Sequence, residues 1–230
     1  MPELHGYGPI ILEGAALTLA VALLSLAIAV ALGMAGALAR LSPLPPLSGL
    51  AVVYTTLIRG VPDLVLMLLI FFGGQMLVNQ VAPMLGHDDY VDVSPFTAGV
   101  MTLGFIYGAY MSETFRGAIL AVPKGQIEAA QAFAMRRGQI FRRILLPQML
   151  RHALPGFGNN WLVLLKATAL LSVIGLDDMV RMAGVAAGAT RQPFTFYLVV
   201  AVLFLAMTSV STLLLGWAER RYSRGFTRAA

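Results

Sequence analysis

Three ionisable residues lie inside apolar stretches of the sequence, where a charge is costly. Asp63, Glu113 and Lys166 each fall within a hydrophobic run long enough to enter a lipid bilayer. A charged side chain at the bilayer centre costs at least about 2.5 kcal/mol on insertion scales, so such residues usually have a partner or a function. One interpretation is that they line a path that admits a polar solute. The other is structural: Glu113 pairs with Lys166 across two helices, and Arg59 extends to the inner interface beside Asp63.

Motifs for catalysis by this chain are missing from the sequence. There is no GxxxxGK[ST] phosphate loop, so ATP is not expected to bind in that way. The three histidines, His5, His87 and His152, are scattered and show no HExxH or paired spacing, which argues against a metal site. Cysteine is absent, which excludes disulfides and thiolate ligands. We therefore expect no enzymatic activity, no cofactor and no bound metal.

The composition indicates an integral membrane protein. Of the 230 residues, 58% are hydrophobic and only 12% are charged, whereas soluble domains carry about 25% charged residues. About 20 apolar residues cross the hydrocarbon core. The sequence therefore predicts a single all-α membrane domain, 1–230, with five spans joined by loops at 40–53, 79–95, 123–153 and 177–193. The five predicted spans are 10–39, 56–78, 96–122, 154–176 and 194–217.

The distribution of positive charge predicts the orientation of these spans, because cytoplasmic loops retain Lys and Arg. Loop 79–95 has neither, whereas loop 123–153 has six and the tail after Trp217 has four. Arg40 falls on the same side as these two basic segments. The predicted N-terminus is therefore outside and the C-terminus cytoplasmic. The net charge of +5 then reports topology, and no nucleic-acid partner is expected.

The basic loop 123–153 has the pattern of two short helices. Pro123 suits a helix start, and Glu128 suits the positive end of the helix dipole. Gly138 offers a break, after which apolar residues recur at three- and four-residue spacing up to Met149. Such a helix could seat in a groove on a partner protein, or lie on anionic membrane lipid. The spacing alone leaves the two interpretations equal.

The residues of this loop resemble a known motif. Glu128-Ala129-Ala130, a small residue at 134 and then Ile144-x-Leu146-Pro147 resemble the EAA loop of permease subunits of bacterial ABC importers. The family has glycine at the position of Ala134, so a positive φ is not expected there and Gly138 is the candidate for the turn. Further segments resemble the polar amino-acid permeases, most closely the Q-type subunits for histidine and lysine/arginine/ornithine uptake. These segments are 54–67, 104–110, 113–117 and 154–161, within a match over residues 7–225.

The resemblance implies one half of a type I importer in the bacterial inner membrane. Two such subunits, commonly paralogues, form the path; a pair of cytoplasmic ATPase subunits drives it, and a periplasmic binding protein delivers the amino acid. The family motif does not assign residues of the path; from their charge, we infer that Asp63 and Glu113 are the first candidates for contact with a cationic substrate. By position, the ATPase-coupling residues are Glu128, Ala129, Ala130, Ala134, Gly138, Ile144, Leu146 and Pro147.

Two other classes of function remain open at this stage. A secondary transporter or channel would act alone, but the odd number of predicted spans and the lack of an inverted repeat weigh against it. A membrane anchor without a path of its own would tolerate neutralisation of Asp63, Glu113 and Lys166.

Overall fold

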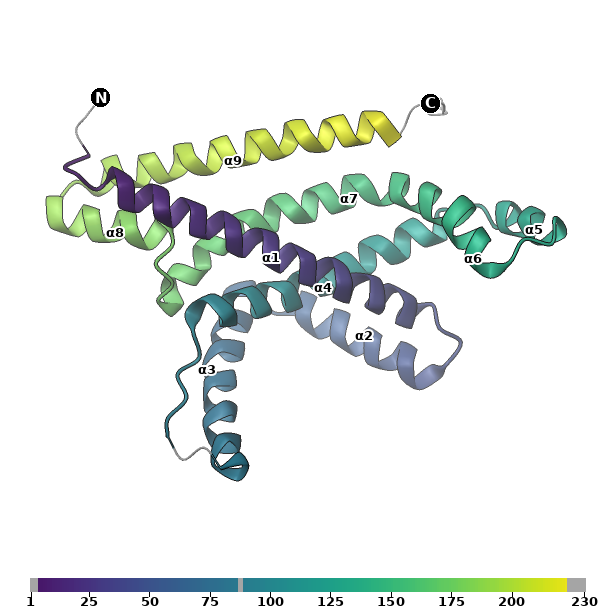
Figure 1. Cartoon of the computed structure of the whole chain (residues 1–230), viewed down its shortest axis with the longest axis horizontal. Coiled ribbons are helices and arrows are strands. Elements are labelled where there is room, and N and C mark those ends of the chain that lie inside the picture. The colour runs from purple at the N-terminus through teal and green to yellow at the C-terminus, as the bar shows by residue number, and fades with distance from the viewer. Residues whose placement is uncertain (1–3, 87–88, 223–230) are drawn as a thin grey trace.

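The computed structural model describes residues 4–86 and 89–222, and every regular element in these two ranges is helical (Figure 1). The all-α prediction is therefore confirmed. His87, and the tail residues Arg224 and Arg228 that supported the predicted orientation, lie outside the described residues. The α-helices are α1 (Gly8–Arg40), α2 (Pro45–Gly60), α3 (Asp63–Val81), α4 (Pro95–Leu120), α5 (Lys124–Ala132), α6 (Arg137–Ile140), α7 (Leu146–Ala167), α8 (Met179–Thr190) and α9 (Pro193–Tyr222). The other helical turns are Ala82–Leu85, Phe141–Leu145 and Thr168–Ile174.

The core of the molecule is the crossing of α1 and α4. Small residues let the two backbones approach: a methyl group added at Gly104 would lie 2.6 Å from Ile28 Cγ2, and one at Gly108 would lie 2.9 Å from Leu32 Cβ. Because real side chains do not tolerate such contacts, these two positions require glycine, as in other close membrane-helix crossings. The α7 helix packs on the same core, where Asn160 Nδ2 donates to Thr114 Oγ1 at 2.9 Å.

Four helical segments are both long enough and apolar enough to cross a membrane: Gly8–Arg40, Asp63–Met84, Arg137–Ile174 and Pro193–Tyr222. The predicted third span corresponds to α4, which has 26 residues and would be about 39 Å long, but it is not among the four. Half of α4 is buried: 13 of its residues are packed against other helices. A helix surrounded by protein needs less apolar surface than one facing lipid. The length and burial of α4 are therefore compatible with a fifth span, and the five-span topology stays a prediction.

The predicted second span is wrong at its start. Residues 56–60 belong to α2, which occupies most of the predicted loop 40–53, and α3 begins only at Asp63. Val61 is extended, with φ −116° and ψ 140°, because the ring of a following proline disfavours helical backbone at the preceding residue. Pro62 therefore divides one apolar run into two helices.

The predicted boundary at residue 153 is also wrong, because the chain is helical without interruption from Arg137 to Ile174. Pro155 lies inside α7 rather than in the first turn of a helix. A widened π-helical turn, Phe141–Leu145, precedes Pro147. Pro147 has no N–H to donate and its ring would clash with the carbonyl four residues earlier, which a wider turn relieves. The predicted loop 177–193 likewise contains a helix, α8.

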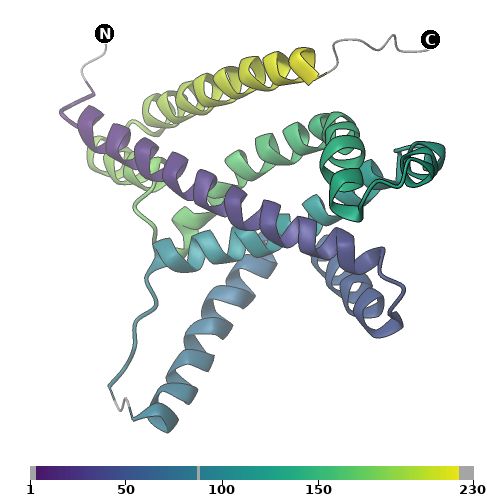
Figure 2. The same cartoon turned by 45° about the vertical axis from the view of Figure 1, so that its right-hand side comes forward.

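The two ends of the molecule differ in charge. Figures 1 and 2 show the N-terminal end of α1 together with α8 at one end, and the α1–α2 connection, α5, α6 and the end of α9 at the other. The second end carries Arg40, the basic residues of the 123–153 segment and Arg220 and Arg221. The first end carries Arg181 and Arg191 together with Asp177 and Asp178, so the two ends differ in degree, and the charge-based orientation stays a prediction.

Candidate functional site

A polar pocket of about 300 Å³ lies where the C-terminal ends of α1 and α2 meet α4. It is an unusual surface for this chain, because both signs of charge come together between helices that are otherwise apolar. The lining residues are Arg40, Thr55, Thr56, Arg59, Gly60 and Glu113.

Glu113 is held in this pocket by two arginines. Its Oε1 lies 3.3 Å from Arg40 Nη2, and its Oε2 accepts from Arg116 Nη2 at 2.9 Å and from Arg116 Nε at 3.0 Å. The two arginines balance the charge of Glu113, and its side chain keeps 18% of its surface exposed. Oε1 itself is buried and accepts no hydrogen bond within the described residues, so Arg40 holds it by charge alone. The predicted Glu113–Lys166 pair is wrong, because Lys166 is exposed on α7 and forms no ion pair within residues 4–86 and 89–222.

Asp63 is the first residue of α3 and belongs, with Arg59, Tyr107, Tyr110, Glu113 and the two arginines that hold Glu113, to one polar cluster around the pocket. It accepts a hydrogen bond from the Tyr107 hydroxyl at 2.9 Å and a longer one from Tyr110 at 3.5 Å, and the two rings are stacked with centroids 5.5 Å apart. The Arg59 guanidinium lies 5.7 Å from the centre of the Tyr110 ring, within the range of a cation–π contact. Arg59 and Asp63 are thus linked through Tyr110, and the described residues show no direct ion pair between them.

Sequence reasoning missed four members of this cluster: Arg40, Tyr107, Tyr110 and Arg116. One local signal was available. Tyr107, Tyr110, Glu113 and Arg116 follow one another at three-residue steps, and residues three apart on a helix are neighbours. The contribution of Arg40 had no such signal, because it depends on where the end of α1 meets α4.

The second candidate site is the basic segment 123–153, called the coupling segment below after its predicted role, which lies at the same end of the molecule as the α1–α2 connection. In α5, Glu128 and Ala129 are exposed while Ala130 is buried. Phe133, which follows α5, keeps 84% of its surface exposed. Farther along, Ile144 and Leu146 are half-buried in the long helix. Five cations of the segment are exposed, against the single acid Glu128: Lys124, Arg136, Arg137, Arg142 and Arg143.

The turn between α5 and α6 is at Ala134, not at Gly138. Ala134 has φ +53°, whereas Gly138 lies within α6 and has no positive φ. Two hydrogen bonds explain the turn: Ala134 N donates to Gln131 O at 2.8 Å, and Met135 N donates to Ala130 O at 3.1 Å. This is the Schellman pattern that ends many helices, normally with glycine in the left-handed position. The expectation that Ala134 avoids a positive φ is therefore wrong.

Comparison with known proteins shows that nearly the whole chain is similar to permease proteins of amino-acid and octopine transport systems. It is 54% identical to the histidine/lysine/arginine/ornithine transport system permease protein HisQ of Escherichia coli (strain K12), over 98% of this chain and 99% of that protein. It is 44% identical to the octopine transport system permease protein OccQ of Rhizobium radiobacter, over 98% of both. The arginine ABC transporter permease protein ArtQ of Escherichia coli (strain K12) is 37% identical, over 92% of this chain and 94% of that protein.

Solved structures give the same result for the fold. A chain from the crystal structure of an amino acid ABC transporter with histidines superposes with a TM-score of 0.79 at 34% identity, over 94% of this chain and 95% of the other. A chain of the inward-facing MetNI methionine ABC transporter superposes with a TM-score of 0.75 at 18% identity, over 97% and 100%, which supports the fold alone.

The family model of the binding-protein-dependent transport system inner membrane component matches residues 27–224. The chain therefore belongs to this family and is a multi-pass permease subunit of an importer in the inner membrane.

Proposed function

We propose that this chain forms half of the translocation path of an ATP-driven importer for basic amino acids. The names of its relatives, which mention histidine, lysine, arginine, ornithine and octopine, support this substrate class. The single observation that carries the proposal is the pocket that brings Arg59 and Glu113 together. A basic amino acid carries a carboxylate at one end and a cation at the other, and the pocket offers a partner for each.

The charges of the pocket favour one arrangement of the substrate. Arg59 lies on the Tyr110 ring and has no carboxylate partner in the described part of the chain, so it is the group for the substrate carboxylate. Glu113 is the pocket's group for the cationic side chain. Asp63 does not line the pocket, but it contacts Tyr110, the residue on which Arg59 lies, and is the second candidate. Glu113 already balances Arg40 and Arg116, so an incoming cation would compete with them. That competition makes binding reversible, as transport requires. Lys166 is not among the pocket residues, and its place in the path stays a prediction.

A second, paralogous permease subunit would complete the path beside α2 and α3. The α3 helix buries only Leu66 and Met67, although it is apolar enough to span the membrane. Its remaining apolar surface is available to lipid or to a partner helix. With the N-terminus outside, five spans would place α8 and the 89–94 connection on the side where a periplasmic binding protein delivers its amino acid.

The coupling segment would engage a pair of cytoplasmic ATPase subunits, which hydrolyse ATP on a separate chain. Exposed aromatic residues are frequent anchors of protein interfaces, so Phe133 would enter a groove on the ATPase while Glu128 fixes the register. The surrounding basic residues favour an acidic rim on that partner. Closing of the ATPase dimer would then move the helix Arg137–Ile174, because α5 is joined to its first residues through the turn at Ala134 and the rest of that helix is continuous.

Reconstitution tests this proposal. The chain, its paralogue, the ATPase and the binding protein are placed in liposomes, and amino-acid-stimulated ATP hydrolysis and uptake of labelled arginine are measured. Glu113→Gln should raise the concentration for half-maximal uptake about tenfold, since it removes the group for the cationic side chain. Glu13→Gln is the matched control, because Glu13 is an exposed acid in the first half of α1.

The outcomes separate the competing functions. Unchanged affinity and rate in Glu113→Gln and Asp63→Asn would remove the pocket from the path and favour an anchor subunit. Uptake that persists without the ATPase would instead make the chain a stand-alone transporter.

A further inference from the structure

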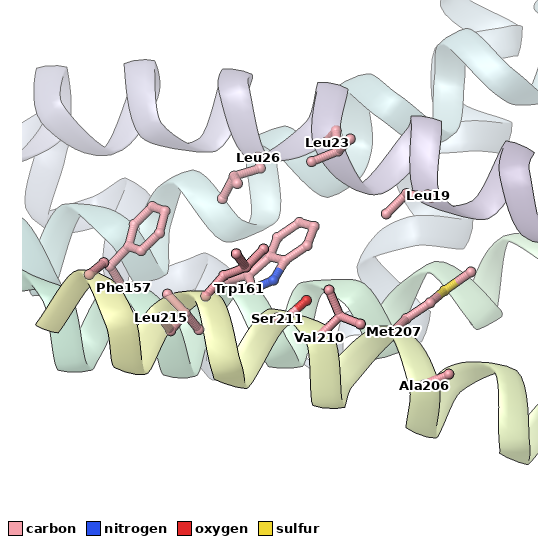
Figure 3. Close-up of a pocket in the computed structure, with 12 residues that line it drawn as sticks. Leu19, Leu23, Leu26, Phe157, Trp161, Ala206, Met207, Val210, Ser211 and Leu215 are labelled. Atoms are coloured by element: carbon pink, nitrogen blue, oxygen red, sulfur yellow. The ribbon is translucent and has the colours of Figure 1, made fainter. Parts of the chain in front are cut away.

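A second concavity lies between α1, α7 and α9 and is almost entirely apolar. This groove has a volume of about 660 Å³, within the usual range for ligand sites, and shares no lining residue with the polar pocket. Figure 3 shows Trp161 between the leucines of α1 and the side chains of α9. The lining residues are Leu19, Leu23, Leu26, Phe157, Trp161, Ala206, Met207, Val210, Ser211, Leu214, Leu215 and Ala218.

The groove exists because α9 has fully buried side chains at only one end. Phe196 and Val200 are its buried residues, and both lie in the half that contacts α8. Beyond them, α9 runs past α7 and α1 without a buried side chain of its own. All three walls come from segments apolar enough to span the membrane, so the groove opens where the solvent is hydrocarbon.

We propose that this groove binds one acyl chain of an anionic phospholipid from the cytoplasmic leaflet. The apolar walls fit an acyl chain, and the charge at the cytoplasmic end of α9 selects the headgroup. Groove positions on α9 recur at three- and four-residue spacing up to Leu214 and Ala218, and the next position on that stripe is Arg221. Arg220 faces away from the groove, because it lies two residues after Ala218, or about 200° around the helix.

The position of Arg221 is what an anionic lipid requires. It is exposed and lies three residues beyond the last groove position, which is about 4.5 Å along the helix axis. Basic residues at this depth attract anionic headgroups. Tyr222, also exposed, is of the type that gathers at membrane interfaces. The proposal does not depend on the amino acid carried through the polar pocket.

The two tryptophans of the chain allow a direct test. Trp217 is 63% exposed on α9 and does not line the groove. Trp217→Phe therefore leaves Trp161 as the sole tryptophan, whose emission is selected from that of the tyrosines by excitation at the red edge of the absorption band. The full-length variant is placed in phosphatidylcholine nanodiscs, and phosphatidylglycerol with brominated acyl chains is titrated in. Bromine quenches tryptophan at close range, so quenching reports an acyl chain in the groove.

We expect half-maximal quenching of Trp161 at a mole fraction about fivefold lower for brominated phosphatidylglycerol than for brominated phosphatidylcholine, the factor expected for one arginine near the surface. Arg221→Gln should abolish this difference, and its matched control Arg220→Gln should keep it. Native mass spectrometry of the unmodified chain gives a second readout: one phosphatidylglycerol should stay bound and be lost in Arg221→Gln.

Two results would overturn the proposal. Equal quenching by the two lipids, with no retained phosphatidylglycerol, would make the groove ordinary lipid-facing surface. Absence of quenching at Trp161, while Trp217 in a Trp161→Phe chain is quenched, would show that protein covers the groove, either a second copy or the partner subunit.

Discussion

The polar pocket and the coupling segment are stabilised in different ways. In the pocket, Glu113 is mostly enclosed and held by Arg40 and Arg116 from two helices. In the coupling segment, Glu128 and Phe133 are exposed, and the local backbone is held by its own hydrogen bonds. Packing between helices therefore stabilises the first site, whereas local sequence stabilises the second. Changes in the pocket should reduce stability and transport together, and changes to the exposed side chains of the coupling segment should reduce coupling alone.

The largest effect should come from removing the acid of the pocket. Glu113→Ala leaves Arg40 and Arg116 facing each other without a counter-charge, and the free energy of unfolding should fall by about 3 kcal/mol, the lower part of the range for a broken buried ion pair. Thermal unfolding in detergent measures this change, with Glu13→Ala as the exposed control.

Adding Arg40→Gln to Glu113→Gln sharpens the result. If the ion pair is the cause, the double variant should be more stable than the sum of the single changes predicts, by about 1 kcal/mol. Strict additivity would mean that Arg40 and Glu113 act independently, and the comparison between the two sites would lose its main support.

A buried acid that forms no ion pair within the described residues should behave differently from Glu113. Asp178 caps α8, and its Oδ1 accepts from the Arg181 backbone N–H at 2.9 Å, while Oδ2 is buried and unpartnered. Burial raises the Asp178 pKa from 3.8 to about 6, although the backbone N–H groups of Arg181 and Val180 oppose the rise. The folded chain thus holds this proton more tightly than the unfolded chain does.

The sign of the pH dependence follows from this difference. The stabilising effect of the proton is fully present below about pH 4 and is lost as the pH rises through about 6. Asp178→Asn keeps a capping oxygen, so it should be more stable than the natural chain at pH 7 by on the order of 2 kcal/mol, and the difference should disappear near pH 4. A difference that stays constant from pH 4 to pH 7 would contradict a raised pKa.

These sites also show what a linear sequence can and cannot specify. The positions from Glu128 to Pro147 form a spaced local motif, and the apolar segments follow from hydropathy, so both could be found in the sequence, while the coupling role of the motif stays a prediction. The partner of Glu113 could not be found there, because no local pattern states that the end of α1 meets α4.

Proline disfavours helical backbone at the preceding residue, yet the chain breaks at Pro62 and stays helical through Pro155. The difference depends on packing, because α7 packs on α4 whereas α2 and α3 diverge after Pro62.

In the coupling segment, a reversed charge should leave the fold intact. Glu128 is exposed and has no ion pair within the described residues, so Glu128→Lys should change the unfolding temperature little. If Glu128 faces the ATPase as proposed, amino-acid-stimulated ATP hydrolysis and uptake should nevertheless fall about tenfold, or about 1.4 kcal/mol in coupling free energy, because the charge at that contact is reversed. Gln126→Lys, an exposed position earlier in α5, is the control. Equal losses of ATP hydrolysis and uptake in both variants would mean that only the net charge of α5 matters and that Glu128 has no specific role.

The smallest effect is expected at Ala134, where the local backbone itself can be tested. An alanine at φ +53° carries a strain of about 1 kcal/mol that glycine avoids. Ala134→Gly relieves it but also frees the unfolded chain, so the net gain should stay below about 1 kcal/mol. Ala134→Val should lose more than that, since branched side chains tolerate the left-handed region poorly. Limited proteolysis between α5 and α6 measures the local opening, with Gly138→Ala as the control because Gly138 is helical. If Gly138→Ala opened the segment and Ala134→Val did not, the turn would lie at Gly138, and the Schellman hydrogen bonds of α5 would not be what holds the coupling residues in place.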